Sequence, residues 1–339
     1  MAKSGPGRSE REGISVKKFF QMFPDNKAAE KWFIQQRWPD GIRCAFCESE
    51  NVQTDAKHRT MPFRCRTCRK FFSVKSNSIM HSSKLGYQDW AFAMYGIATN
   101  LKGVSSMKMH RDLDVGQEAA WALMHKLRAA MADTPERVFG WDKFDGPVEV
   151  DETYIGGKEG NKHADKKLNA GRGAVGKTAV VGIRDRATNR VRLEVIGDTT
   201  KQTLQNFITE WTDRETVVYT DEARAYIGLP REHHTIKHGE GEYVRYEVHI
   251  SSVGEFIEHQ VSTNGMESFW SLFKRGYIGV YHKMSPEHLH RYAAEFEARH
   301  NARPMDTMEQ MEDVVQKMEN KRLRYGDLMP NSKYGRSLS

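Results

Sequence analysis

The chain has 339 residues, of which 38% are hydrophobic and 29% are charged, and this composition excludes fibrous and wholly disordered proteins. Its length leaves room for two or three domains. The net charge of +7 lies near the N-terminus, because residues 1–75 contain 16 Lys and Arg against 8 Asp and Glu, and the other residues contain 36 against 37. We therefore expect a polyanionic partner for the N-terminal region.

The sequence contains no run of about 18 apolar residues, so we expect no membrane-spanning segment and no membrane partner. The start, MAKSGPGRSEREG, is polar and lacks the hydrophobic stretch of a secretion signal. Residues 1–15 are interpreted as a flexible basic tail. We expect a cytoplasmic protein of bacterial type, associated with the nucleoid if its polyanionic partner is DNA.

Residues 16–80 are predicted to form short helices, marked by aromatic residues at helical spacing, followed by a zinc ribbon. Cys44 with Cys47, and Cys65 with Cys68, form two CxxC pairs that have 17 residues between them. This spacing is typical of a closed tetrahedral site in which four thiolates hold a structural Zn²⁺. A redox motif is the alternative, but such a CxxC motif normally occurs singly and opens a helix.

Seven basic residues surround these cysteines in the sequence, interleaved with phenylalanines. They are Arg43, Lys57, Arg59, Arg64, Arg66, Arg69 and Lys70. Because each Lys or Arg adds salt-dependent affinity for phosphate, we expect the ribbon to contact the backbone of double-stranded DNA. A charged face that contacts only water is the alternative.

Residues 84–132 are predicted to form a helix-turn-helix unit for DNA binding. Apolar periodicity indicates helices over residues 87–100, 105–113 and 117–131, with Ser105 available as an N-cap. The side chains of the third helix that we expect to face a DNA groove are those of Gln117, Glu118, Trp121 and His125. A plain three-helix core is the alternative interpretation.

Residues 145–303 are predicted to form a catalytic α/β domain of the ribonuclease H-like class, with a mixed five-stranded sheet and helices. Alternating β-branched residues indicate strands, and one helical pattern interrupts them. The predicted strands are 148–155, 178–185, 190–196 and 216–221, and the helix is 199–211. Three strands, a helix and a further strand are the opening of that fold.

Two acidic pairs occur on the first and fourth of these strands, Asp151 with Glu152 and Asp221 with Glu222. In this fold one acid from each strand converges with a third acid from a helix, for which Glu267 is the candidate. Clustered carboxylates repel one another and would bind divalent cations, here two Mg²⁺ or Mn²⁺ ions. Since neighbouring strand residues face opposite sides, at most one acid of each pair points at a shared metal, and periodicity does not select it.

Residues 262–276 are predicted to form the helix that carries the third acid. At helical spacing Glu267, Ser271 and Lys274 share one face. Lys274 is then placed to hold the phosphate of the strand that is cut. Any charged helix can present such a spacing, so a solvated face is the alternative.

Several phrases of the sequence agree, in order, with one family. They are RWPDGIRCAFC, FRCRTCRKFF, VEVDETYIGGK, YTDEARAYIGL, TNGMESFWSLFKRGYIGVYHKMS and HLHRYAAEFEARHNAR. From about Phe23 to Arg303 the chain closely resembles the ISXO2-like insertion-sequence transposases, related to Merlin elements, which join a zinc ribbon to a DDE catalytic domain. The resemblance implies hydrolysis at transposon ends and then attack of the freed 3′ hydroxyl on target DNA.

The resemblance also selects residues. It implies that Asp151, Asp221 and Glu267 are the catalytic metal ligands and that Lys274 is their basic partner. Some relatives have asparagine as the third residue, and Asn264 lies one helical turn before Glu267, so Asn264 is the alternative. The segment 246–260 is longer than the family's usual approach to this helix.

The C-terminal segment, residues 304–339, is predicted to be a helix and tail. Met308, Met311, Val314, Val315 and Met318 form a helical stripe that indicates core or partner packing. Because two DNA ends must be held together, we expect a homodimer or higher assembly on the transposon terminal repeats and target DNA, with this helix at the protomer contact.

Two further patterns are interpreted as carrying no ligand. Residues 171–178 match GxxxxGKT, but they follow a polar stretch and precede a β-rich one, so no nucleotide partner is expected. Histidines such as His233, His234 and His259, with His238 and His249, lack a clear ligand spacing. Two other functions are possible for the chain: a DNA-binding regulator with a catalytically silent scaffold, or a nuclease that does not transfer strands.

Overall fold

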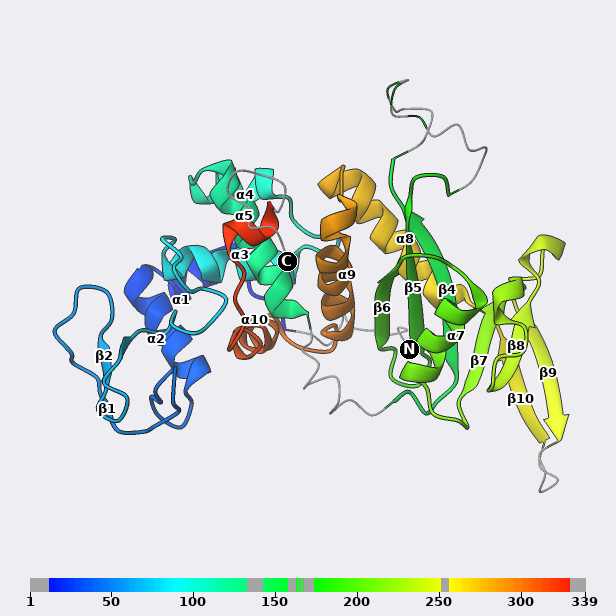
Figure 1. Ribbon diagram of the computed structural model, residues 1–339, viewed down its shortest axis with the longest axis horizontal. Coiled ribbons are helices and arrows are strands. Elements are labelled where there is room, and N and C mark those ends of the chain that lie inside the picture. The colour runs from blue at the N-terminus through cyan, green and yellow to red at the C-terminus, as the bar shows by residue number, and fades with distance from the viewer. Residues whose placement is uncertain are drawn as a thin grey trace. The chain divides into compact units, whose positions relative to one another are not determined.

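The computed structural model describes residues 12–132, 143–157, 163, 165, 167, 174–250 and 256–329 (Figure 1). The chain divides into two compact units, Met1–Asp133 with Ala302–Ser339, and Thr134–Asn301. Most of the predicted tail, and the first three residues of the GxxxxGKT match, lie outside the described residues. The end of that match forms the start of a strand at Thr178, whereas a phosphate-binding loop would open a helix there.

The first unit consists of helices and a small antiparallel sheet with the strand order β1-β2-β3. Its elements are α1 (Val16–Met22), α2 (Asn26–Arg37), β1 (Val52–Gln53), β2 (Phe63–Cys65), β3 (Phe71–Phe72), α3 (Tyr87–Thr99), α4 (Ser106–Leu113), α5 (Gln117–Met131), α10 (Thr307–Gln316) and α11 (Tyr325–Leu328). Side-chain oxygens of Ser15, Asp25 and Ser105 accept hydrogen bonds from backbone N–H groups and start α1, α2 and α4.

The helices α4 and α5 lie against each other with a tight turn between them, in which Asp114 has a φ of 50°. The N-terminal residues of α5, Gln117 and Glu118, are exposed. His125 is 0% exposed, so the prediction that it faces a DNA groove is wrong. It belongs to the buried side of α5, together with Leu123 and Leu127.

The C-terminal stripe is part of the core of the first unit. α10 packs against α2, α3 and α5, and Met311, Val314, Val315 and Met318 are buried. The helix also ends at Gln316, earlier than the periodicity indicates. The stripe therefore packs in the core of its own chain, which is one of the two roles that its pattern indicates, and a part of this helix in a protomer contact stays a prediction.

The second unit contains a mixed five-stranded sheet with the order β6-β5-β4-β7-β8. Its elements are β4 (Val148–Ile155), β5 (Thr178–Asp185), β6 (Val191–Ile196), α7 (Lys201–Trp211), β7 (Val217–Asp221), the 3₁₀ helix η3 (Arg224–Tyr226), β8 (Glu232–Ile236), the 3₁₀ helix η4 (His238–Glu240), β9 (Arg245–Ile250), β10 (Phe256–Val261), α8 (Asn264–Gly276), the π-helical turn η5 (Tyr277–Tyr281) and α9 (Pro286–Asn301). β4, β5 and β6 pair antiparallel, and β7 and β8 continue the sheet in parallel. This arrangement fits the predicted ribonuclease H-like fold.

Helices cover both faces of this sheet (Figure 1). The apolar side of α7, from Leu204 to Trp211, packs with Val148 and Val150 of β4 on one face. α8 and α9 form a second cluster with β5 and β6 on the other face. Because alternate residues of β4 point to opposite faces, each acid of this strand faces either α7 or the layer of α8 and α9.

The segment 246–260, which the sequence leaves as a long approach to α8, is largely an antiparallel hairpin of β9 and β10. The hairpin lies next to the edge strand β8. Among the helices of the described ranges, none is long and apolar enough to cross a membrane.

Candidate active site

Two of the predicted acids lie on neighbouring strands of the five-stranded sheet, β4 and β7. β4 and β7 run parallel, with Val148 opposite Val218. Asp151 and Asp221 lie three residues further along β4 and β7, and the charge of Asp221 raises the pKa of Asp151, so the two carboxylates are neighbours. β7 ends at Asp221, whose carboxylate accepts a hydrogen bond of 3.0 Å from the backbone N–H of Ala223.

Strand alternation separates Asp151 from Glu152. Val148 and Val150 face α7. Glu152 is two residues beyond Val150 and therefore points to the same side of the strand, where it accepts a hydrogen bond of 2.5 Å from the hydroxyl of Tyr226. Asp151 is the neighbour of Glu152 on the strand, so it points to the opposite face of the sheet, which α8 covers. The geometry therefore puts Asp151, and not its neighbour, on the side of the predicted third acid.

The environment of Asp151 disfavours its negative charge. Burial first, and then the charges of Glu152, Asp221 and Glu267, raise the pKa of Asp151 from 3.8 to about 7, although a backbone hydrogen bond lowers it. Burial also raises the pKa of Glu152. The negative charges of Asp221 and Glu267 thus repel that of Asp151, and a divalent cation between the carboxylates would remove this repulsion. The three predicted acids thus form one electrostatic cluster.

Glu149 of β4 fixes the N-terminal end of α8. One carboxylate oxygen, Oε2, accepts a hydrogen bond of 2.9 Å from the backbone N–H of Met266. The other, Oε1, lies 3.2 Å from Arg184 Nη1 and 2.9 Å from Arg186 Nε. Since Glu267 directly follows Met266, this buried contact sets the position of the third acid relative to β4.

Two glycines allow α8 to approach the sheet closely. A Cβ on Gly265 would lie 2.1 Å from Nη1 of Arg184, and a Cβ on Gly182 would lie 2.5 Å from Cε of Met266. Gly182 is the partner of Asp151 in the register of β4 and β5. A larger residue at Gly265 would displace the side chains of Arg184 and Glu149, and one at Gly182 would displace those of Met266 and Trp270.

The remaining predicted residues lie along α8. Asn264 is the first residue of the helix, Glu267 lies in its first turn, and Lys274 lies in its last turn. All three side chains are exposed, as expected for groups that meet a macromolecular substrate. The charge of Glu267 reaches Asp151, as the pKa of Asp151 indicates. The choice of Glu267 over Asn264 stays a prediction.

We expect Asp151→Asn to stabilise the metal-free protein at alkaline pH, although it removes a site residue. A raised carboxyl pKa means that the folded state binds the proton more tightly, so stability falls as pH rises from 3.8 to about 7. At about pH 8 the variant should gain about 1 to 3 kcal/mol. Calorimetry in EDTA at about pH 8 and about pH 4 measures the difference in stability between the variant and the wild type. An equal difference at the two pH values would contradict the raised pKa of Asp151.

Comparison with known proteins gives a family match within the second unit. Residues 143–301 match the family model described as the ISXO2-like transposase domain. Residues 143–301 therefore form an ISXO2-like transposase domain. The chain is also 25% identical, over 292 residues, to an uncharacterized protein in the transposable element ISH50 of Halobacterium salinarum; the match covers 82% of this chain and 91% of that protein. The family recognised from the sequence, an insertion-sequence transposase, is confirmed.

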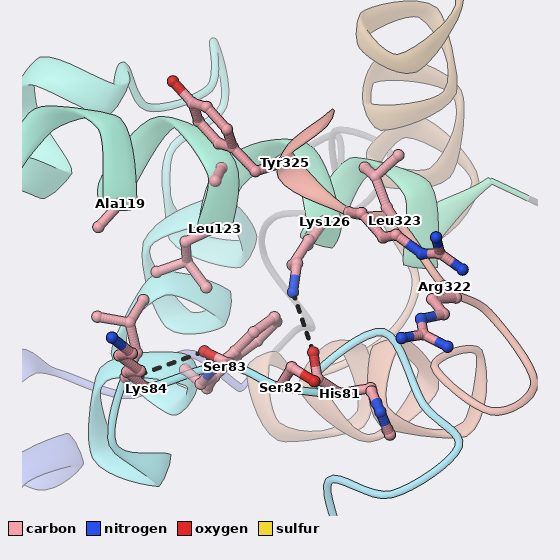
Figure 2. Close-up of a pocket in the computed structure, with 14 residues that line it drawn as sticks. His81, Ser82, Ser83, Lys84, Ala119, Leu123, Lys126, Arg322, Leu323 and Tyr325 are labelled. Carbon is pink, nitrogen blue, oxygen red and sulfur yellow. Dashed lines mark hydrogen bonds between the residues drawn. The ribbon is translucent and has the colours of Figure 1, made fainter. Parts of the chain in front are cut away.

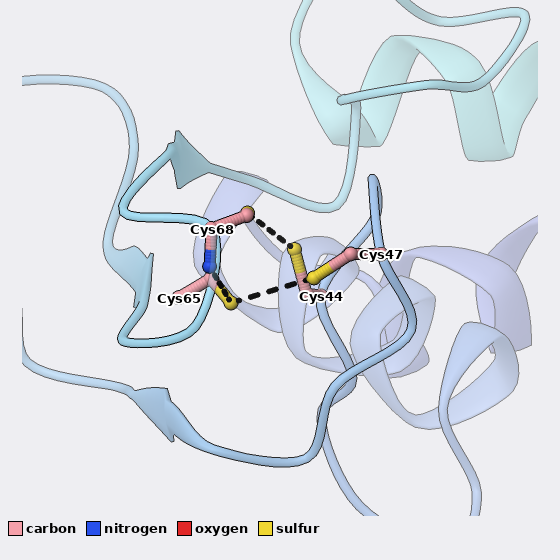
Figure 3. A group of neighbouring side chains, drawn as sticks. All are labelled: Cys44, Cys47, Cys65 and Cys68. Atoms are coloured by element: carbon pink, nitrogen blue, oxygen red, sulfur yellow. Dashed lines mark hydrogen bonds between the residues drawn. The ribbon is translucent and has the colours of Figure 1, made fainter.

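Outside the transposase domain, the four cysteines gather in the first unit (Figure 3). Sγ of Cys44 lies 3.5 Å from Sγ of Cys68, and Sγ of Cys47 lies 3.7 Å from Sγ of Cys65. A tetrahedral Zn²⁺ with bonds of about 2.3 Å sets its sulfurs about 3.8 Å apart, whereas a disulfide needs about 2.05 Å. The donor set and its spacing fit a zinc ribbon.

Backbone donors around the sulfurs favour thiolates. The N–H groups of Phe46 and Cys68 point at the sulfurs of Cys44 and Cys65, each at 3.4 Å. The N–H of Cys68 is the main cause that lowers the pKa of the Cys65 thiol. Burial raises the pKa of the Cys44 thiol, although its backbone hydrogen bonds lower it. Thiolates are the form that ligates zinc.

The seven basic residues around the cysteines are all exposed. Arg64 lies over the ring of Phe71 and Lys70 lies over the ring of Phe46, at 5.3 Å and 4.8 Å from the ring centres. These contacts hold the cations in place and leave their charge available to a phosphate. The predicted basic surface of the ribbon is therefore present.

A second basic feature of the first unit is a cavity of about 320 Å³ beside α5 (Figure 2). Its cationic lining consists of Lys84, Lys126, Arg322 and Arg324, with His81 next to them. Burial first, and then the charges of Arg322 and Lys75, lower the pKa of Lys126. An anion in the cavity would offset this excess of positive charge.

Sequence reasoning missed the group of Glu149, Arg184 and Arg186. The sequence does indicate the position of Glu149, because it lies two residues before Asp151 on the same strand and therefore faces the same layer of helices. Its partners come from β5 and from the turn after it, and their pairing with β4 is visible only once the register of the two strands is known.

Proposed function

We propose that the protein is a DNA transposase that binds transposon ends and catalyses Mg²⁺-dependent strand cleavage and strand transfer. The observation that supports the proposal is that Asp221, on the strand beside β4, and Glu267, on α8, both lie close enough to Asp151 for their charges to raise its pKa. The family of the catalytic domain supports the same activity. Such an enzyme acts on chromosomal DNA, so the proposal includes a cytoplasmic, nucleoid-associated location.

Asp151, Asp221 and Glu267 would hold two Mg²⁺ or Mn²⁺ ions through their carboxylate oxygens. When bound, these ions supply stabilisation for the charge that develops at the reacting phosphate. Lys274 lies two helical turns beyond Glu267 on the same face of α8 and is exposed, so it can neutralise a neighbouring phosphate of the scissile strand. In the first step water cleaves the phosphodiester and releases a 3′ hydroxyl; in the second that hydroxyl displaces a 3′ oxygen of the target.

The first unit would hold the DNA. Its exposed ribbon cations fit backbone contacts, and the exposed start of α5 with Gln117 fits entry into a groove. Because two terminal repeats and a target must be held at once, we include a homodimer or higher assembly on double-stranded DNA, with no nucleotide partner.

We further propose that Cys44, Cys47, Cys65 and Cys68 bind one structural Zn²⁺. Cys47→Ser should release this zinc and unfold the ribbon, because a small three-stranded sheet has little core of its own. Binding to the terminal repeats should weaken by about tenfold or more, the usual effect of losing several phosphate contacts. Zinc content and a gel-shift titration measure the two effects, and unchanged binding would show that the ribbon does not hold DNA.

The activity is tested with labelled terminal repeats, supercoiled target DNA and Mg²⁺, with EDTA as the control. The proposal expects end cleavage and joined products that depend on the metal. Specific binding of the repeats without cleavage would overturn it in favour of a DNA-binding regulator with a silent scaffold. Cleavage without joining would overturn strand transfer and leave a nuclease.

A further inference from the structure

A group of buried histidines lies at the edge of the sheet, where the hairpin of β9 and β10 meets β8. Glu232 and His234 are two residues apart on β8 and therefore share a face, and His259 of β10 joins them. One nitrogen of each ring and one carboxylate oxygen lie within 4.8 Å of one another. His234 is 8% exposed and His259 is 4% exposed, whereas the side chain of Glu232 is 51% exposed.

The two imidazole rings are oriented by residues behind them. Nδ1 of His234 lies 2.7 Å from a carboxylate oxygen of Glu247 on β9, and since a carboxylate only accepts, this nitrogen carries the proton. Nδ1 of His259 lies 3.0 Å from the hydroxyl of Tyr219 on β7. Carboxylates and hydroxyls in this position fix the rings of metal-binding histidines in proteins.

Both Nε2 atoms converge on one oxygen of Glu232. Nε2 of His234 is 3.1 Å from Oε1, and Nε2 of His259 is 3.3 Å from the same atom. The rings are stacked, with their centres 4.5 Å apart and an angle of 29°, so both nitrogens lie on the same side. A tetrahedral Zn²⁺ with bonds of about 2.0–2.1 Å holds neighbouring ligands about 3.3 Å apart, which matches these distances.

We propose that Glu232, His234 and His259 bind a transition-metal ion, Zn²⁺ by the nature of the ligands, at a site separate from the cysteines and from the catalytic acids. Two imidazoles and one carboxylate are a set that zinc prefers, and they leave one position for water. The exposure of Glu232 provides a path from solvent to the site.

The ion ties together two parts of the chain that lead to catalytic residues. β8 pairs with β7 up to Asp221, and β10 leads through Ser262 into α8, which carries Glu267. Arg186 already holds this junction through the carbonyl oxygen of Ser262, at 2.7 Å. The bound metal thus fixes the hairpin of β9 and β10 to the edge strand β8 of the sheet.

The test counts metal in the full chain. The purified protein is stripped with chelator, reloaded with Zn²⁺, passed over a desalting column and assayed by mass spectrometry. We expect two zinc ions per chain for the wild type, and one for His234→Gln or His259→Gln. His233→Gln is the matched control, because His233 lies on the same strand but contacts Thr220 at 2.8 Å, and it should keep both ions. Glu247→Gln should weaken the site by about tenfold or more.

A second measurement does not depend on the folding of the histidine variants. In Cys47→Ser loaded with Co²⁺, we expect one bound ion with visible absorption but without the intense thiolate-to-cobalt bands that the wild type shows. If the wild type binds only one ion, and Cys47→Ser binds none, the proposal is overturned. The cluster would then consist of histidines that pair with carboxylates and hold no metal. Equal loss in the His233→Gln control would overturn it as well.

Discussion

Replacing Asp151 or Asp221 by Asn, or Glu267 by Gln, is expected to reduce DNA cleavage and joining by roughly a thousandfold or more, with terminal-repeat binding retained. Each change removes one carboxylate from a group in which the charges of Asp221 and Glu267 both act on Asp151. Because the acids act as a unit, double variants should lose little more than single ones. Rates from labelled ends in Mg²⁺ and gel-shift affinities measure the two properties separately.

The control for these variants is Glu222→Gln. Glu222 directly follows Asp221, is exposed, and lies one residue beyond β7, so its replacement should leave cleavage within about twofold of the wild type. Asn264→Ala tests the alternative third residue in the same assay. If Asn264→Ala loses most of its cleavage activity and Glu267→Gln stays active, Asn264 and not Glu267 is the third metal-binding residue.

The sequence alone is sufficient to predict the central strands and the helices that carry the candidate acids. β4, β5 and α5 were expected with the bounds that they have, because their β-branched or helical patterns are strong and are closed by turn residues. The family resemblance then selected Asp151 over Glu152. In the structure the physical reason is strand parity, which requires knowledge of which helix covers which face.

The edge of the sheet could not be predicted in the same way. β8 has the sequence EHHTI, in which charged and ring side chains replace the apolar alternation that marks a strand. Its position depends on pairing with β7 and on the hairpin beside it, both of which are contacts distant in the sequence. The apolar stripe of α10 shows the same limit, because periodicity indicates a buried face without saying what buries it.

Glu149→Ala is expected to destabilise the transposase domain by about 3–5 kcal/mol, the range found when one partner of a buried ion pair is removed. The side chain of Glu149 is 5% exposed and neutralises Arg184 and Arg186, which are themselves only 20% and 19% exposed. Its loss also removes the acceptor for the N–H of Met266. Calorimetry of the domain measures the loss of stability, and the cleavage assay measures the displacement of Glu267.

Two comparisons separate positioning by Glu149 from a purely structural role. Glu149→Gln keeps an acceptor for Met266 but not the charge, so it should recover part of the cleavage rate even where stability stays low. Glu240→Ala breaks the more exposed pair of Lys237 and Glu240 in the same domain and should cost about 0.5 kcal/mol or less. If Glu149→Ala lost stability but cleaved normally at low temperature, Glu149 would hold the fold and not the third acid. Recovery of cleavage by Gln without recovery of stability would establish that the side-chain oxygen at position 149, which accepts from the N–H of Met266, positions α8 for the reaction.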